Sequence, residues 1–483
     1  MNLSKSRVIS GLQCPKKLWL EIHKPGLIEH SAATEAQFTA GYEVGAIAQA
    51  LYGEGEGDTV AYDPGLREAV ARTRSLMAER SATPIFEATY ASENVLARID
   101  VLLRANGVNR IVEVKSAASV KDVHVNDCAI QAWLFRAAGY ALDAVAVAHV
   151  DNSFVYPGGG NYAGLLIEED VTEVVHPLLE QVPRWVAEAK EVLDGPEPVK
   201  AIGSHCHQPY DCQFQHYCKP SYPVYPVTLL KGSRKVIGEL LEEGYRDIRE
   251  IPDGRLTDAG QLRIWRVTRD GQAQVDGSAA EFARRLAYPR YYLDFETVSL
   301  AVPIWAGTRP YEKLPFQWSC HIEETSGELK QTGFLDLSGG PPMRGCAESL
   351  IQHLGQAGPI LMYTSYEKGI LNGLVARFPD LAEPLQGLID RLVDLKPVTK
   401  ANYYHPDMFG SWSLKAVLPT IAPDMQYSAL EEVQDGMAAG RAFLEAIHPE
   451  TGMARRSELA DRLRMYCGYD TLAMVRLVRF FAA

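Results

Sequence analysis

The sequence predicts an α/β fold, and three segments carry the prediction. The apolar segment YYLDFETV at 291–298 reads as a strand and begins a region in which strand and helix patterns alternate. Earlier, residues 95–115 read as two strands, and residues 123–139 follow them as a helix. A chain of 483 residues also exceeds the roughly 250–300 residues that one hydrophobic core usually organises. We therefore expect more than one α/β domain.

A proline-rich segment marks the first expected boundary. KPSYPVYPVTLL at 219–230 contains three prolines, which interrupt regular structure. We expect domains over 1–220, 221–285 and 286–483. The middle segment faintly resembles a helix–hairpin–helix module around Gly244, and a spacer between domains is the alternative.

Composition indicates a soluble protein of the reducing cytoplasm. The apolar fraction of 47% and the charged fraction of 23% are ordinary for globular proteins. No apolar run reaches membrane-span length, and MNLSKSRVIS lacks the apolar core of a signal peptide, so we expect no membrane partner. The net charge of −13 gives no support to a nucleic-acid partner, although clustered metal-binding carboxylates would add to that charge.

Two carboxylates and a lysine form the first candidate site. Asn106-Gly107 predicts a hairpin that brings the strand with Asp100 beside the strand with Glu113 and Lys115. Side chains two apart on a strand share a face, so these three groups can hold a divalent ion and orient a water. A solvent-facing, mutually compensating Glu113–Lys115 pair is the alternative.

The following helix completes a recognisable order. It carries Asp127, Gln131 and Phe135 on one face. Asp100, Glu113-x-Lys115 and Gln131 together resemble the PD-(D/E)xK nuclease core in its RecB-like form. The resemblance implies a restriction-endonuclease-like core in which Asp100 and Glu113 bind metal, Lys115 assists the attacking water and Gln131 lies close by.

One family feature is missing. The family often has a Gly-x-x-x-His pattern in its first helix, and the matching stretch FTAGYEVGAIAQ has Gly41 and Gly45 without the histidine. Glu43 and Glu87 are the candidates to substitute for it.

Three evenly spaced cysteines form the second motif. Cys206, Cys212 and Cys218 lie in HCHQPYDCQFQHYC, in a chain with eight cysteines in all. In a reducing compartment such clusters more often bind metal than pair with one another. Three thiolates leave one ligand of a four-ligand site to be found elsewhere.

RecB-like nucleases of the AddB and CRISPR-associated Cas-four types place one cysteine before the core and three after it, around a 4Fe–4S cluster. Cys14 before the core and the triple after it resemble that order. The resemblance implies a cluster bound by Cys14, Cys206, Cys212 and Cys218 that staples the two ends of the domain. Zinc, which four thiolates also suit, and unrelated structural cysteines are the alternatives.

A second acidic site is expected in the last region. Asp294 and Glu296 lie two apart on the strand YYLDFETV, Glu367 opens a helix, and Tyr466 and Asp470 are one turn apart on another helix. Four carboxylates from three elements can hold two metal ions for phosphodiester cleavage. Acidic residues that only cap helices or face solvent are the alternative.

This order resembles the DEDD superfamily of 3′–5′ exonucleases, which have the RNase H-like fold. The resemblance implies that Asp294, Glu296, Glu367 and Asp470 bind metals while Tyr466 positions the nucleophilic water. The family's middle motif normally supplies an aspartate, so Glu367 is one methylene longer. Asp394 is expected as an auxiliary group.

Nearly the whole chain resembles bacterial proteins that fuse the two nuclease types. The resemblance implies a Mg²⁺- or Mn²⁺-dependent nuclease that degrades DNA from free ends or as single strands, in DNA repair or phage defence. It does not distinguish DNA from RNA and names no protein partner. The alternative is a nucleic-acid-binding scaffold with one or both sites inactive.

Overall fold

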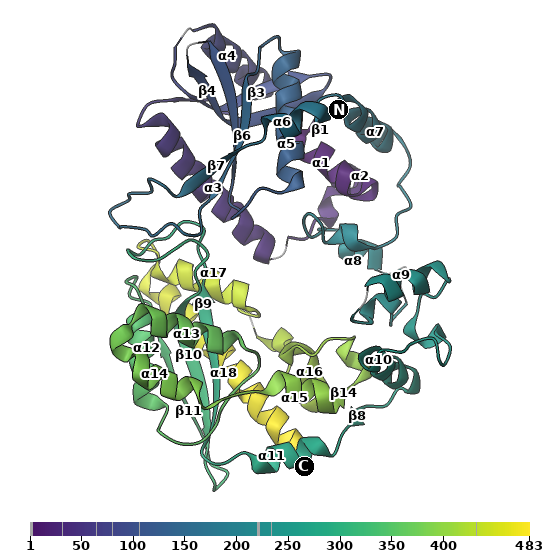
Figure 1. The fold of residues 1–483 in the computed structure, drawn as a ribbon, viewed down its shortest axis with the longest axis vertical. Coiled ribbons are helices and arrows are strands. Elements are labelled where there is room, and N and C mark those ends of the chain that lie inside the picture. The colour runs from purple at the N-terminus through teal and green to yellow at the C-terminus, as the bar shows by residue number, and fades with distance from the viewer. Residues whose placement is uncertain are drawn as a thin grey trace. The chain divides into compact units, whose positions relative to one another are not determined.

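The computed structural model describes residues 3–30, 32–63, 65–79, 81–105, 107–219, 223–232, 234–430 and 432–483. The chain forms two compact units, one of residues 1–220 with 300–312, the other of residues 221–299 with 313–483. Both units mix helices and sheets, which confirms the predicted α/β class (Figure 1). Residues 221–285 thus fall within the second unit, and 300–312 return to the first.

The first unit contains a mixed sheet flanked by helices. Its strands are β1 Leu3–Ser4, β2 Asp58–Thr59, β3 Ile85–Ser92, β4 Val95–Ala105, β5 Val108–Lys115, β6 Ala144–Val150 and β7 Leu166–Asp170. Its helices are α1 Lys5–Gln13, α2 Pro15–His23, α3 Ala32–Gly53, α4 Leu66–Ala78, α5 Asp122–Ala137, α6 Thr172–Val175, α7 Val182–Asp194 and α8 Gln215–Cys218. The strand order is β2-β3-β4-β5-β6-β7, and β1 pairs with β4.

The predicted hairpin and helix of this unit are confirmed. β4 and β5 are antiparallel, with Val101 opposite Val112, and α5 begins at Asp122 after them. Asn106 lies outside the described residues, and Gly107 has a φ of +81°, which a glycine adopts at little cost. The helix α5 packs against β3, β4, β5 and β6, and its buried face carries Cys128, Gln131 and Phe135.

The second unit is built on a five-stranded sheet. The strands of the whole unit are β8 Gln274–Val275, β9 Arg290–Val298, β10 Leu314–Glu323, β11 Leu329–Leu335, β12 Ile360–Met362, β13 Leu392–Asp394 and β14 Tyr403–Tyr404. Its helices are α9 Arg234–Glu242, α10 Ala259–Asp270, α11 Ser278–Arg285, α12 Met343–His353, α13 Tyr366–Arg377, α14 Ala382–Ile389, α15 Leu395–Asn402, α16 Leu414–Ile421, α17 Gly436–Ile447 and α18 Met453–Ala482. The main sheet has the order β11-β10-β9-β12-β13, and β8 pairs with β14 apart from it.

Strand β9 occupies the centre of this sheet, and between Arg290 and Thr297 its residues are apolar on both faces apart from the acidic pair. It pairs antiparallel with β10 and parallel with β12. The long helix α18 packs against β9 and β10. The predicted helix at Glu367 is confirmed as α13, which follows β12 and has Glu367 in its first turn.

Within the described residues, no helix has both the length and the apolar character that crossing a bilayer requires.

Candidate active sites

The structure brings the first-site residues together on β4, β5 and α5. The backbone N–H of Val114 donates to Asp100 Oδ2 at 2.8 Å, which fixes Asp100 beside β5. Lys115 Nζ donates to Glu113 Oε1 at 2.7 Å, and Gln131 Nε2 donates to Glu113 Oε2. The alternative of a solvent-facing pair does not hold for Glu113, because this residue is only 1% exposed.

Two further residues belong to this group. Lys115 Nζ also donates to Asp127 Oδ2 at 2.7 Å, so Asp127 joins from the helix face that carries Gln131. Lys5, the first residue of α1, donates from Nζ to Glu113 Oε1 at 2.7 Å. The Lys5 contact spans 108 residues of sequence, and no local pattern around Lys5 predicted it.

The charges of the first site nearly compensate one another. Burial and the neighbouring Glu113 carboxylate raise the pKa of Asp100 to about 7, against the opposing effect of the two lysines. Burial acts to raise the pKa of Glu113 too, but Lys115 and Lys5 outweigh it and hold that pKa well below its usual range. Glu113 is therefore ionised, while Asp100 exchanges its proton near neutral pH.

A cavity of about 440 Å³ opens onto these carboxylates. Its lining includes Asp100, Glu113 and Lys115 from the sheet, with Gly41 and Gly45 from α3. Of the two proposed substitutes for the missing histidine, Glu87 lines this cavity and Glu43 is not among its lining residues.

Glu87 has an unusual backbone conformation. It lies on β3 between residues that pair with Ile99 and Val101, hence opposite Asp100. Its φ is +58°, an uncommon value for a residue other than glycine, and its carboxylate pairs with Arg98 at 3.1 Å. Glu87 is thus a fourth acidic group, after Asp100, Glu113 and Asp127, and it lies at the rim of the first site.

A neighbouring cavity of about 650 Å³ connects the site with the cysteine-rich loop. It is lined by Lys115, Lys121 and His124 on one side and by His207 and Tyr210 on the other. Burial, with Lys115 next in effect, lowers the pKa of His124 to about 4, so this histidine is neutral at neutral pH. The cavity offers lysines for phosphates and ring faces for bases.

The four predicted cluster ligands also come together. Cys14 caps α2 at its N-terminal end, Cys206 lies in the short helical turn Ser204–Cys206, and Cys218 ends α8. With Cys212, all of them line one cavity, together with Lys16, Lys17, Lys200 and the apolar Leu20, Ile202 and Phe214. No disulfide joins any of the eight cysteines, all of which lie in the described part of the chain.

The donor set suits an anionic metal–thiolate group. Four sulfurs converge from segments at both ends of the unit, and the three lysines can balance the negative charge of such a group. The loop is tied to α1 by Gln13, whose Nε2 donates to the carbonyls of His205 and Tyr210 at 2.7 Å each. These residues can hold the implied cluster.

The second site gathers its acidic residues as predicted from three elements. Asp294 and Glu296 project from β9, Glu367 from the first turn of α13, and Asp470 from α18. Glu296 and Glu367 are buried, and Asp294 and Asp470 are half-buried. The alternative of helix caps and solvent-facing groups therefore does not describe them.

Burial has the largest effect on the pKa values of these acidic residues, and repulsion between their carboxylates comes next. Burial, then the carboxylates of Asp470, Glu296 and Glu367, raise the pKa of Asp294 well above its usual value. Burial and Asp470 raise that of Glu296, and burial raises the pKa of Glu367 to about 7. A site of this kind favours either protons or metal cations.

Tyrosines border the acidic group. Tyr466 is 4% exposed, and burial and the Asp470 carboxylate raise its pKa. Tyr427, which the sequence did not single out, donates from its hydroxyl to Asp470 Oδ1. Lys415 places Nζ 5.1 Å from the Tyr427 ring and 5.4 Å from the Tyr466 ring.

Two more groups approach the acidic residues. Cys467 of α18 offers a sulfur that lies with oxygens of Asp294 and Glu296 within 4.8 Å of one another. Asp394, the expected auxiliary group, caps α15 by accepting from Lys396 N at 2.9 Å. Its charge also raises the pKa of Glu367, although burial has the larger effect on that pKa. Asp394 therefore has a structural role as well as an electrostatic one.

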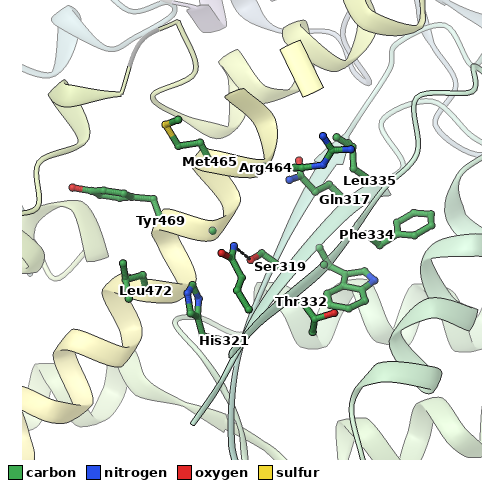
Figure 2. Close-up of a pocket in the computed structure, with 14 residues that line it drawn as sticks. Gln317, Ser319, His321, Thr332, Phe334, Leu335, Arg464, Met465, Tyr469 and Leu472 are labelled. Carbon is green, nitrogen blue, oxygen red and sulfur yellow. Dashed lines mark hydrogen bonds between the residues drawn. The ribbon is translucent and has the colours of Figure 1, made fainter. Parts of the chain in front are cut away.

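The other flank of α18 borders a groove of about 760 Å³ that is separate from the acidic group (Figure 2). Met465, Tyr469 and Leu472 of α18 form one side. Gln317, Ser319 and His321 of β10 form the other, and their register partners on β9 are Glu296, Asp294 and Tyr292. The acidic residues and this groove thus share one face of the sheet.

Comparison with known proteins gives one match. Residues 291–413 match the model of a family described as Domain of unknown function (DUF2779). The matched segment contains Asp294, Glu296 and Glu367 and ends before α18, which carries Tyr466 and Asp470. No curated protein gives a significant match to the chain.

Proposed function

We propose that the protein is a metal-dependent nuclease that hydrolyses phosphodiester bonds in DNA, from free ends or in single strands. The convergence of Asp294, Glu296, Glu367 and Asp470 on one site is the observation that carries the proposal. Mg²⁺ or Mn²⁺ bound there would supply positive charge to the attacking and leaving oxygens.

The residues of the chain have distinct tasks in this proposal. The four carboxylates hold the metal ions, and their ionisation is coupled to metal binding because cations replace protons between them. The buried Tyr466 hydroxyl, next to Asp470, orients the attacking water. Lys415 at the rim counteracts the raised pKa values of Glu296 and Asp470, and it would attract a phosphate.

The first site supports a second nuclease centre of the RecB-like form. Asp100 and Glu113 are its metal ligands, Lys115 assists the attacking water, and Gln131 orients Glu113. The adjoining 650 Å³ cavity, with Lys121 and Tyr210, would take a single strand by charge and stacking.

A 4Fe–4S cluster on Cys14, Cys206, Cys212 and Cys218 belongs to the proposal. The convergence of the four cysteines with three lysines supports it. Anaerobically purified protein is expected to be brown and to contain about four irons per chain. Colourless protein with one zinc per chain would assign the site to zinc instead.

The alternative is a nucleic-acid-binding scaffold with an inactive first site. One observation favours it, because both oxygens of Glu113 already accept from side chains of the protein. Incubation with 5′-labelled single-stranded DNA and Mn²⁺ separates the two functions. The nuclease degrades the strand, whereas a scaffold shifts it in a gel and leaves it intact.

A further inference from the structure

Lys5 is held in a fixed place by the structure around it. The strand β1 immediately before it pairs with β4, with Ser4 opposite Leu96. The Ser4 side chain caps α1 by accepting from Arg7 N at 3.3 Å. The Lys5 side chain is 15% exposed, so its ammonium group is directed into the protein.

The ammonium group of Lys5 shares one carboxylate oxygen with Lys115. Both Nζ atoms lie 2.7 Å from Glu113 Oε1, and Gln131 takes Oε2. A carboxylate oxygen has about two lone-pair sites, so Oε1 is fully used by the two lysines. A divalent ion can bind this oxygen only when one lysine moves away.

Of the two lysines, Lys5 makes fewer close contacts with carboxylates. Lys115 also contacts Asp127 Oδ2 at 2.7 Å, whereas Lys5 lies 4.0 Å from the same oxygen. We propose that Lys5 is a positioning residue of the first site that occupies Glu113 in the metal-free protein and is displaced by the divalent ion. This inference rests on the proposed metal-binding role of Asp100 and Glu113.

The helix α1 links this lysine to the cysteine cavity. Lys5 is its first residue, and Cys14, which directly follows Gln13, is its C-cap. Gln13 fastens the same end to the loop through the carbonyls of His205 and Tyr210. Because α1 is a single helix of nine residues, we expect a shift at Gln13 to reach Lys5 at its other end.

Calorimetric titration with Mn²⁺ tests the role of Lys5. The full-length protein would carry Asp294→Asn and Asp470→Asn, so that Mn²⁺ reports on the first site alone. In this background Lys5→Met is expected to bind Mn²⁺ about 10- to 100-fold more tightly, the value of one charged hydrogen bond. Lys5→Arg is expected to keep the weaker affinity.

Lys24→Met is the matched control, because Lys24 pairs with Glu197 at 2.9 Å in the same unit and lies outside both cavities of the first site. Its Mn²⁺ affinity is expected to equal that of the background. An unchanged or weaker affinity in Lys5→Met would overturn the inference and leave the proposed metal site standing. Absence of Mn²⁺ binding in both the background and Lys5→Met would overturn the metal site as well.

Gln13→Leu tests the link through α1. It removes two hydrogen bonds to the loop without touching a cysteine, and it is expected to tighten Mn²⁺ binding in the same direction as Lys5→Met. Combined with Lys5→Met, it should have no further effect, because both act through one contact. Independent, additive effects would show that α1 does not connect the two centres.

Discussion

In the first unit the buried carboxylate of Glu113 lies against two lysines, whereas in the second unit four carboxylates lie together with the exposed Lys415 at their rim. The task proposed for both sites, holding divalent ions, is therefore prepared in two ways. The first site is charge-compensated by the protein itself. The second site is compensated only when protons or cations enter it. The two sites should differ in activity, stability and pH dependence.

The largest expected effect is on cleavage. Asp294→Asn removes a proposed metal ligand and is expected to lower the rate of single-strand degradation at least about 100-fold, since even groups behind metal ligands contribute 10- to 100-fold. Glu113→Gln is the counterpart in the first site. Degradation of 5′-labelled DNA with Mn²⁺ measures both.

The pair of variants assigns the activity. Full activity in Glu113→Gln with loss in Asp294→Asn would place cleavage in the second unit alone and make the first unit a binding platform. Unchanged activity in Asp294→Asn would contradict the assignment of the second site.

Stability in chelator is expected to change in opposite directions at the two sites. Lys115→Met removes the cation nearest to Asp127 and one of the two that pair with Glu113, and it should lower the free energy of unfolding by about 1.5–3 kcal/mol. Asp294→Asn relieves repulsion among carboxylates and should raise it by about 0.5–2 kcal/mol. Urea titration with EDTA present measures the two changes, and equal signs would refute the contrast.

The sequence predicted the second site more completely than the first. Asp294, Glu296, Glu367 and Asp470 follow from strand and helix periodicity, because each lies where an element presents one face. Tyr427 was missed because it begins a single 3-10 turn, Tyr427–Ala429, which is too short for a period to predict where a side chain points.

In the first site, too, local sequence patterns did not predict every contact. Asp100, Glu113 and Gln131 follow from a hairpin and the next helix, but Lys5 reaches Glu113 across 108 residues of sequence. This contact depends on how β1 pairs with β4, and a local sequence pattern does not predict the pairing of distant strands. The return of residues 300–312 to the first unit was unpredictable for the same reason.

The dependence of stability on pH should be steeper in the second unit. The folded-state pKa of Glu367 is about 7 against an ordinary value of 4.5, so the folded protein binds the proton more strongly. The stabilisation is therefore complete below the ordinary value and is lost as pH rises toward 7, by up to about 1.4 kcal/mol per pH unit. Asp294 and Glu296 shift in the same direction.

Amide hydrogen exchange in chelator checks this dependence locally. Protection of β9 and α18 is expected to fall between pH 5 and about 7 more than that of β4 and β5, where Asp100 is the one ligand with a raised pKa. Saturating Mn²⁺ should remove the difference. A parallel loss in both units would contradict the comparison.

The smallest expected effect concerns the tyrosine beside Asp470. Tyr466→Phe keeps the buried ring and removes only the hydroxyl, so kcat should fall about 10-fold, while Mn²⁺ affinity and stability change little. Steady-state degradation kinetics and Mn²⁺ titration measure the two quantities. A loss of Mn²⁺ binding would instead make the hydroxyl part of the ligand set.

The segment at 300–312 determines where the chain can be cut to express one unit without the other. Ala301 and Val302 lie in a buried apolar cluster with Val44, Val150 and Leu165 of the first unit. A fragment that stops at residue 220 would lose part of this cluster and leave its remaining members open to water. Expression of the first unit alone therefore requires residues 300–312 to be grafted back onto it.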